Sequence, residues 1–212
     1  LIFSFPGYEK TAEAISKTLS ADIGNVTFRS FPDGESYVRL DSDVRGRRVI
    51  LVCGLDHPDQ KIMGILFFSK VVREGGAFSL LLVAPYLGYM RQDMRFHSGE
   101  AVTSQIFAEL LSGAIDGLVT VDPHLHRYAS LDEIYSVPSR VVSATGLISA
   151  WIGQKVVGPV LIGPDEESDQ WVSQVAKRAN APYLVLRKIR RGDRDIEISV
   201  PDVEKYQSYT PV

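Results

Sequence analysis

Residues 79–128 constrain the fold most, because they contain two short apolar runs that each end in a loop rich in ionisable side chains. The first run, residues 79–84, leads into a loop of Arg, Gln, Asp and His, and the second, residues 118–121, ends directly on Asp122, Pro123 and His124. An amphipathic helix is predicted between them. Buried strands that end in polar loops are typical of an open α/β sheet, whose ligands bind beyond the carboxyl ends of the strands. We therefore interpret the two loops as parts of one site.

The same alternation of strand and helix continues along the chain and predicts an α/β fold with mainly parallel sheets flanked by helices. Val102, Ile106 and Leu110 form one apolar face of the central helix, and Gly113 fits its C-terminal cap. A new αβ pattern begins near Ser143, so two domains, 1–142 and 143–212, are expected. The individual predictions are strands at 1–5, 49–53, 79–84, 118–121, 160–163 and 183–186, an edge strand within 135–142, a hairpin across 26–40, and helices at 11–19, 62–72, 101–112, 144–152 and 169–179.

Composition excludes several classes of protein. The length of 212 residues fits one large or two small domains. The composition, 45% hydrophobic and 23% charged, is typical of a globular protein. A net charge of −3 provides no basic field and argues against a nucleic-acid partner. The single Cys53 excludes an internal disulfide and indicates a buried thiol in a reducing compartment. No apolar stretch is long enough to cross a bilayer and residues 1–5 lack a basic lead, so we expect a cytoplasmic protein without a membrane partner.

Acidic and imidazole side chains at two strand ends suggest a metal site. Asp122, His124 and His126 alternate, so in an extended chain they would point to the same side and could share one cation. One imidazole and one carboxylate, completed by water and phosphate oxygens, suit Mg²⁺ bound with a nucleotide, whereas the absence of a Cys pair argues against a closed zinc cage. Residues 165–167, all acidic, could hold a cation or sugar hydroxyls. The alternatives are solvated or core-capping histidines, and acids that complement a helix dipole, with Ser168 capping the helix that follows.

Two clusters of cations are placed to bind phosphate. Arginine forks match phosphate oxygens, and phosphoryl transfer needs positive charge because its transition state spreads negative charge over those oxygens. A solvated basic loop is the alternative for each cluster. No Walker A loop and no GxGxxG motif is present, which argues against P-loop and dinucleotide-binding folds. The clusters are Arg91, Arg95 and His97 with Gln92 and Asp93 in one loop, and Lys188, Arg190, Arg191 and Arg194 in another.

Five motifs join these observations into a family resemblance. They are FPDGE at 31–35, YLGYMRQDMRFHSGE at 86–100, TVDPHLHR at 120–127, IGPDEES at 162–168 and LRKIRRGD at 186–193. Their order and approximate spacing resemble those of the ribose-phosphate pyrophosphokinases, the 5-phosphoribosyl 1-diphosphate (PRPP) synthetases. The residues of the second and third motifs resemble those of the archaeal-like branch of that family.

This resemblance implies two phosphoribosyltransferase-type domains, self-association as a homodimer or higher oligomer, and Mg²⁺ as cofactor. It also implies transfer of the β,γ-diphosphoryl group of ATP to the 1-hydroxyl of ribose 5-phosphate, which leaves AMP. The hairpin tip would reach into the nucleotide site of a neighbouring subunit. The implied roles are ATP binding for Phe31, Asp33, Glu35, Arg91, Gln92 and Asp93, metal binding for His124 and Asp165, catalysis for Lys188 and Arg190, and ribose 5-phosphate binding for Asp165 and Arg190.

Two departures from the family pattern leave alternatives open. Met94 stands where many members carry Arg, a contact that Arg95 can supply. The chain ends at Val212, where the family continues into a strand and a loop that binds the 5-phosphate of ribose, so we expect this chain to lack a proper ribose 5-phosphate site. That absence favours a non-catalytic regulatory homologue, whereas the retained Lys188 and Arg190 argue against one. A phosphoribosyltransferase that consumes PRPP is a further alternative. The FPDGE and RQD loops fit ATP better, and no segment that would cover a bound nucleobase is evident.

Overall fold

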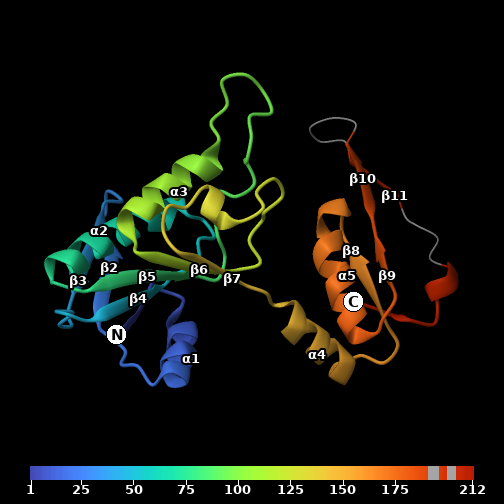
Figure 1. Cartoon of the computed structure of the whole chain (residues 1–212), viewed down its shortest axis with the longest axis horizontal. Coiled ribbons are helices and arrows are strands. Elements are labelled where there is room, and N and C mark those ends of the chain that lie inside the picture. The colour runs from blue at the N-terminus through green and yellow to red at the C-terminus, as the bar shows by residue number, and fades with distance from the viewer. Residues whose placement is uncertain (191–195, 200–203) are drawn as a thin grey trace. The chain divides into compact units, whose positions relative to one another are not determined.

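Strands and helices alternate along the chain in the computed structural model, which describes residues 1–190, 196–199 and 204–212 and, of 187–190 and 196–199, the backbone alone. The chain divides into two compact units, Leu1–Val142 and Ser143–Val212 (Figure 1). Each unit has its own apolar core. No helix in the described part of the chain is long and apolar enough to cross a membrane.

A five-stranded, fully parallel sheet forms the centre of the first unit, in the order β1-β4-β5-β6-β7. The expected mainly parallel sheet is therefore confirmed, and the strand predicted near Pro138 lies at its edge. Both faces of the sheet are covered by helices, which explains why its inner strands are almost continuously apolar. The strands are β1 (Ile2–Ser4), β4 (Arg48–Val52), β5 (Ser79–Ala84), β6 (Gly117–Val121) and β7 (Ser139–Val142), and the helices are α1 (Glu9–Leu19), α2 (Asp59–Glu74) and α3 (Thr103–Ala114), with a 3-10 turn at Leu131–Glu133.

Alternate residues of each strand face different helices. On one face Leu51 of β4 and Leu82 of β5 pack with Phe68 of α2 and Leu111 of α3 in the main core. On the other face Val52 of β4 packs with side chains of β1 and α1 in a smaller cluster. This period of two follows from the pleat of a strand. The parallel pairing of β4, β5 and β6 places their carboxyl ends at the same edge of the sheet.

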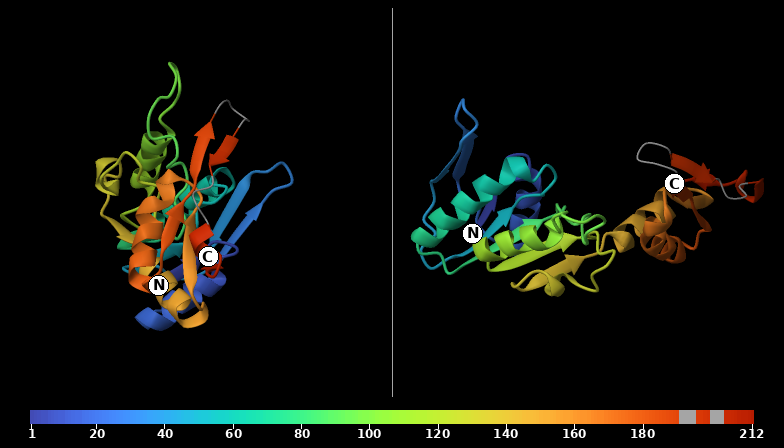
Figure 2. Two further views of the ribbon diagram at one scale, coloured as in Figure 1. Left: turned by 90° about the vertical axis from the view of Figure 1, so that its right-hand side faces the viewer. Right: turned by 90° about the horizontal axis from the view of Figure 1, so that it is seen from above.

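The FPDGE motif lies at the tip of the predicted hairpin, between β2 (Val26–Ser30) and β3 (Ser36–Leu40), which pair antiparallel. Figure 2 shows this hairpin extending from the body of the first unit. Gly34 adopts φ +94°, a conformation that side chains disfavour, and the Phe31 amide closes the turn by donating to the Glu35 carbonyl at 2.8 Å. The Asp33 carboxylate accepts the Glu35 amide at 3.1 Å, so Asp33 shapes the turn.

The predicted apolar face of the central helix proves to be its exposed one. In α3 the buried side chains are Ser104, Phe107, Ala108, Leu111 and Ala114, whereas Ile106 is 58% and Leu110 44% exposed. Gly113 lies inside the helix, which ends at Ala114 with Ile115 as its extended C-cap. The helix carries two apolar stripes, and only its packing on the sheet selects one. Leu19 of α1, seven residues after the buried Ala12 and so on the same side of the helix, is likewise 58% exposed.

The second unit contains a three-stranded parallel sheet in the order β12-β8-β9, with α4 and α5 packed beside it around Ile152, Leu161, Val175 and Ala176. Residues 187–190, expected in a loop, instead form a strand that pairs antiparallel with residues 196–199. The elements are β8 (Pro159–Gly163), β9 (Tyr183–Val185), β10 (Arg187–Arg190), β11 (Ile196–Ser199) and β12 (Thr210–Pro211), α4 (Thr145–Lys155) and α5 (Asp169–Ala179), and 3-10 turns at Glu166–Ser168 and Glu204–Tyr206.

Candidate functional site

The loops that follow β5 and β6 are joined by an ion pair whose carboxylate is buried. The carboxylate of Asp93, in the first loop, has a side chain only 1% exposed, and its Oδ1 accepts a hydrogen bond from Nη1 of Arg127, in the second loop, at 2.9 Å. The Tyr128 hydroxyl donates to the Asp93 carbonyl oxygen at 3.2 Å and lies 2.8 Å from the Ser104 hydroxyl of α3. These contacts hold the RQD motif against the DPHLHR motif at the carboxyl edge of the sheet.

Asp93, which the family resemblance assigns to ATP binding, has a buried side chain. Its second carboxylate oxygen, Oδ2, is buried and has no hydrogen-bond partner among the described residues. A buried carboxylate needs compensation, and here Arg127 supplies it from the neighbouring loop. Arg91 is exposed and Gln92 half-buried, so the side chains of these two residues remain accessible to a ligand while Asp93 orders the loop that carries them.

The remainder of the first loop is held by Glu100. Its carboxylate accepts the backbone N–H groups of Phe96 at 2.8 Å and His97 at 3.0 Å. Hydrogen bonds from these amides, His97 first, lower the pKa of Glu100. Arg95, expected to replace a missing phosphate contact, donates its Nε to the Glu100 carbonyl at 3.0 Å. The side chain of Arg95 therefore closes the loop on itself in this conformation.

The expected sharing of one cation by Asp122, His124 and His126 is wrong. Asp122 adopts φ +36°, so the chain is not extended there and the alternation does not carry the three side chains to one side. Among the residues that the structure describes, no group of three His, Cys, Asp or Glu is placed to hold a metal ion. The rings of His124 and His126 lie 5.8 Å apart, and His124 is half-buried. A single imidazole at a strand end fits an ion that keeps water and substrate oxygens as its other ligands, as Mg²⁺ does.

The hairpin tip presents an aromatic ring with one side already occupied. The Arg29 guanidinium lies 4.6 Å from the centre of the Phe31 ring and 4.1 Å from that of Tyr37. Phe31 is partly exposed at the tip. Stacking of the cation on both rings stiffens the tip. Phe31 thereby keeps an accessible surface suited to a planar ligand, with Asp33 and Glu35 exposed beside it.

A polar cluster of Tyr8, Asp56 and Lys61 near the ends of β1 and β4 was not predicted from the sequence. Nζ of Lys61 donates to the Gly54 carbonyl at 2.8 Å and to Oδ1 of Asp56 at 2.7 Å, and the Tyr8 hydroxyl donates to the same carboxylate. Hydrogen bonds from Lys61 and then Tyr8 strongly lower the pKa of Asp56. Burial acts to lower the pKa of Lys61, but the hydrogen bonds to Asp56 and Tyr8 outweigh it and raise that pKa. Gly54, Asp56 and Lys61 lie within eight residues of one another, but only tertiary packing brings Tyr8 to them from 48 positions away from Asp56.

In the second unit, Asp165 follows β8 and begins the 3-10 turn at 166–168. Its Oδ1 accepts the Ser168 amide at 3.1 Å, and the Ser168 hydroxyl donates back to the Asp165 carbonyl. Ser168, predicted to cap α5, makes no side-chain hydrogen bond to that helix because its hydroxyl is used in this turn. Lys188 and Arg190 lie on β10, of which the backbone is described, whereas Arg191 and Arg194 fall outside the described residues.

The first unit thus belongs to the class of α/β proteins in which loops at the carboxyl ends of parallel strands form the ligand site. Residues 1–114 match the family model described as the N-terminal domain of ribose phosphate pyrophosphokinase. Because this match covers more than half of the chain, the chain belongs to the ribose phosphate pyrophosphokinase family, which confirms the resemblance seen in the motifs.

Several relatives named ribose-phosphate pyrophosphokinase are archaeal, in agreement with the expected branch. The protein of Methanobrevibacter smithii is 32% identical over 91% of this chain and 64% of its own length. That of Saccharolobus solfataricus is 33% identical over 84% and 61%, and that of Methanothermobacter thermautotrophicus 33% identical over 96% and 70%. The chain therefore spans about two thirds of the length of the relatives that it matches.

A solved structure has the same fold. The crystal structure of phosphoribosylpyrophosphate synthetase from Mycobacterium smegmatis aligns with a TM-score of 0.80 and 24% identity. The alignment covers 96% of this chain and 67% of the other. The fold of the chain is accordingly the two-domain phosphoribosyltransferase-type fold of that protein.

Proposed function

We propose that this chain acts as a ribose-phosphate pyrophosphokinase, which makes PRPP for nucleotide biosynthesis. The oxygen of the ribose 5-phosphate 1-hydroxyl attacks the β-phosphorus of ATP, the bond from that phosphorus to the α-phosphate oxygen breaks, and AMP leaves while the hydroxyl proton is released. Family membership supports this proposal. The observation that carries it is the contact of the RQD and DPHLHR loops through Asp93 and Arg127 at the ligand-binding edge of the sheet.

The nucleotide would be bound by exposed groups of the first unit. Phe31 offers its accessible ring surface to adenine, and Asp33 and Glu35 offer carboxylates beside it. Arg91 and Gln92 would contact the nucleotide from the loop after β5. We propose that Phe31, Asp33 and Glu35 serve a neighbouring subunit, so the active form is a homodimer or higher oligomer. For Asp93 we propose positioning of the loop in place of direct ATP contact, because its carboxylate is buried against Arg127.

Mg²⁺ is proposed to bind together with ATP at His124, and Asp165 to supply a second metal or ribose-side ligand. When bound, the ion would neutralise phosphate charge. The imidazole of His124 fits this assignment, because it is half-buried in the loop that follows β6, where substrate oxygens and water can complete the coordination. Asp165 uses one carboxylate oxygen in the turn with Ser168, which fixes the orientation of the group. We place this activity in the cytoplasm, in accord with the free, buried Cys53.

Lys188 and Arg190 would stabilise the negative charge of the diphosphoryl group in the transition state, and Arg190 would also contact ribose 5-phosphate. A cation needed mainly in the transition state contributes to turnover more than to ground-state binding. We therefore expect Lys188→Ala to lower turnover far more than it weakens ATP binding. AMP release and ATP affinity, measured on the variant and on the wild-type protein, test this role. Lys177→Ala, which removes an exposed lysine from the last turn of α5, is the control. A loss of turnover no larger than the loss of ATP affinity would contradict the assignment.

Two simple measurements separate this function from its alternatives. AMP that forms only when ribose 5-phosphate is present identifies a synthetase, whereas no AMP under either condition identifies a non-catalytic regulatory homologue. Ligands that bind only the native state raise the melting temperature. ATP with Mg²⁺ should therefore stabilise the protein, and stabilisation by nucleobases with PRPP in place of ATP would identify a PRPP-consuming phosphoribosyltransferase.

A further inference from the structure

The direction of the β2–β3 hairpin depends on side-chain packing. In the described part of the chain its two strands pair with each other and form a sheet of their own, separate from the five-stranded sheet. Backbone hydrogen bonds to β1 hold the residues just before β2, where the Gly24 amide donates to the Ile2 carbonyl at 2.8 Å. Beyond that point the hairpin extends from the body of the first unit (Figure 2), and side chains decide where its tip lies.

A column of aromatic rings supplies this packing. The centre of the Phe28 ring of β2 lies 4.6 Å from that of Phe5, which follows β1, and 5.7 Å from that of Phe68 on α2. The Phe68 ring in turn meets Phe3 of β1 edge-on at 5.2 Å, and both of these rings are fully buried. Ring pairs at such separations attract each other beyond the effect of burying their area. The column therefore ties the middle of the hairpin to the main core.

Phe28 is the last apolar anchor on the inner face before the hairpin tip. It lies opposite Val38, and both side chains pack against the main core. The next pair on the same face, Ser30 with Ser36, is polar. At about 3.3 Å per residue, Phe31 lies about 10 Å beyond Phe28, so a tilt of about 15° displaces the Phe31 ring by about 3 Å. That displacement is enough to lose a stacking contact, which requires ring centres within about 7 Å.

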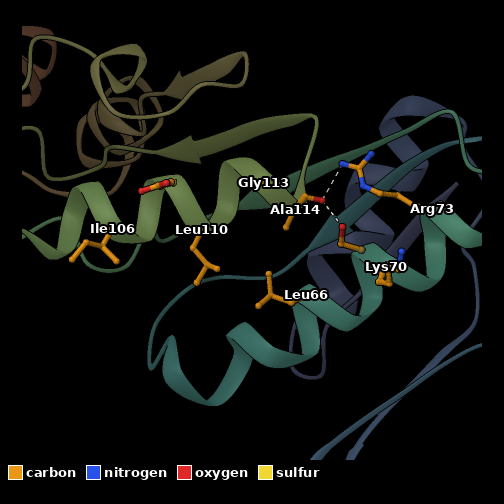
Figure 3. A pocket seen from close by; sticks show the side chains of 9 residues that line it. Leu66, Lys70, Arg73, Ile106, Leu110, Gly113 and Ala114 are labelled. Atoms are coloured by element: carbon orange, nitrogen blue, oxygen red, sulfur yellow. Dashed lines mark hydrogen bonds between the residues drawn. The ribbon is translucent and has the colours of Figure 1, made fainter.

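The column rests directly on the backbone of α2 at Gly64. A Cβ placed on Gly64 would lie 2.9 Å from the Phe5 ring and 3.6 Å from that of Phe28, so a side chain there has to move Phe5 and its contact with Phe28. Helix α2 is fixed in place, because Nη2 of Arg73 donates to the Ala114 carbonyl at the end of α3 at 3.2 Å (Figure 3). A pocket of about 150 Å³ between the hairpin and the start of α2 leaves the rings and the hairpin room to shift.

We propose that Phe28 and Gly64 are positioning residues for the nucleotide, because they set the direction of the hairpin and thereby the place of Phe31. Neither residue touches ATP in this role. The inference rests on the proposed function, in which the Phe31 ring binds adenine. Adenine lies far from the reacting phosphate, so a displaced ring weakens ground-state and transition-state binding equally and leaves turnover unchanged. The expected loss of ATP affinity is about tenfold, the effect of one stacking contact.

A distance measurement tests the packing without any ligand. Spin labels at Pro32→Cys on the tip and Lys17→Cys on α1, both exposed positions, report the hairpin direction by double electron–electron resonance, while the buried Cys53 stays unlabelled. Dilution with unlabelled protein restricts the signal to distances within one chain. Gly64→Ala should shift or broaden the distance, whereas Gly113→Ala, the same change inside α3 where a Cβ meets nothing within 4 Å, should not. An unchanged distance in Gly64→Ala would overturn the proposal.

ATP affinity tests the consequence of that displacement. Isothermal titration with ATP and Mg²⁺ should show about tenfold weaker binding for Gly64→Ala and for Phe28→Leu, which removes the ring but keeps an apolar side chain. Gly113→Ala should bind ATP like the wild type. Turnover at saturating ATP within about twofold of wild type separates positioning from general damage, and far-UV circular dichroism establishes that each variant is folded. A displaced hairpin with unchanged ATP affinity would overturn this inference alone, whereas a wild-type protein that binds no ATP would overturn the proposed function and this inference with it.

Discussion

Removal of the Arg127 guanidinium should destabilise the first unit, because it leaves the Asp93 carboxylate buried without its cation. The Asp93 side chain is 1% exposed and that of Arg127 is 42% exposed. Loss of one partner from a fully buried pair costs about 3–5 kcal/mol. Since water reaches Arg127 and screens the pair, we expect Arg127→Ala to cost about 2–3 kcal/mol, somewhat less than that range. For a protein of this size, the change corresponds to a fall in melting temperature of roughly 6–9 °C.

The placement of tryptophan provides an internal control for this experiment. Both tryptophans, Trp151 and Trp171, belong to the second unit. Urea unfolding of Arg127→Ala followed by far-UV circular dichroism should show an earlier transition, while the tryptophan fluorescence transition should move less. Asp93→Leu combined with Arg127→Met removes both charges and should cost less than Arg127→Ala alone, because no unpaired charge remains. A free energy of unfolding for Arg127→Ala within about 0.5 kcal/mol of the wild-type value, the range of ordinary surface substitutions, would refute this reasoning.

Two further predictions concern the other polar groups of the first unit. Burial raises the pKa of Cys53 to about 12, so the native protein should not react with Ellman's reagent at pH 8, whereas the urea-unfolded protein should release one equivalent; a fast native reaction would contradict the burial of the thiol. The pKa of Asp56 is lowered by Lys61 and Tyr8, so its stabilising contribution is present above the ordinary value of about 3.9 and is lost as the pH falls through the folded-state pKa. Because Asp56 is half-exposed, Asp56→Asn should cost at most about 1 kcal/mol at pH 7. Urea titrations should show this difference narrowing towards pH 3, and a constant difference would exclude the ionic mechanism.

Local sequence patterns were sufficient for the elements and for the family. Apolar runs of four to six residues ending in polar loops identified the parallel strands, and Pro32, Asp33 and Gly34 identified the hairpin turn. Each of these signals involves residues close together in the chain. Backbone geometry and the alternation of side chains act over the same short distances, so the sequence alone carries them.

Long-range packing decided the features that local patterns could not supply. Which apolar stripe of α3 is buried depends on the sheet beneath it, and so Ile106 and Leu110 are exposed while Phe107 and Leu111 are not. The Asp93–Arg127 pair joins residues 34 positions apart, and Tyr8 meets its partner Asp56 across 48. Such contacts form only after the strands have aligned their carboxyl ends. The motifs therefore predict the chemistry of the site, and the fold decided that Arg91 is exposed and Gln92 half-buried while Asp93 is buried and orders their loop.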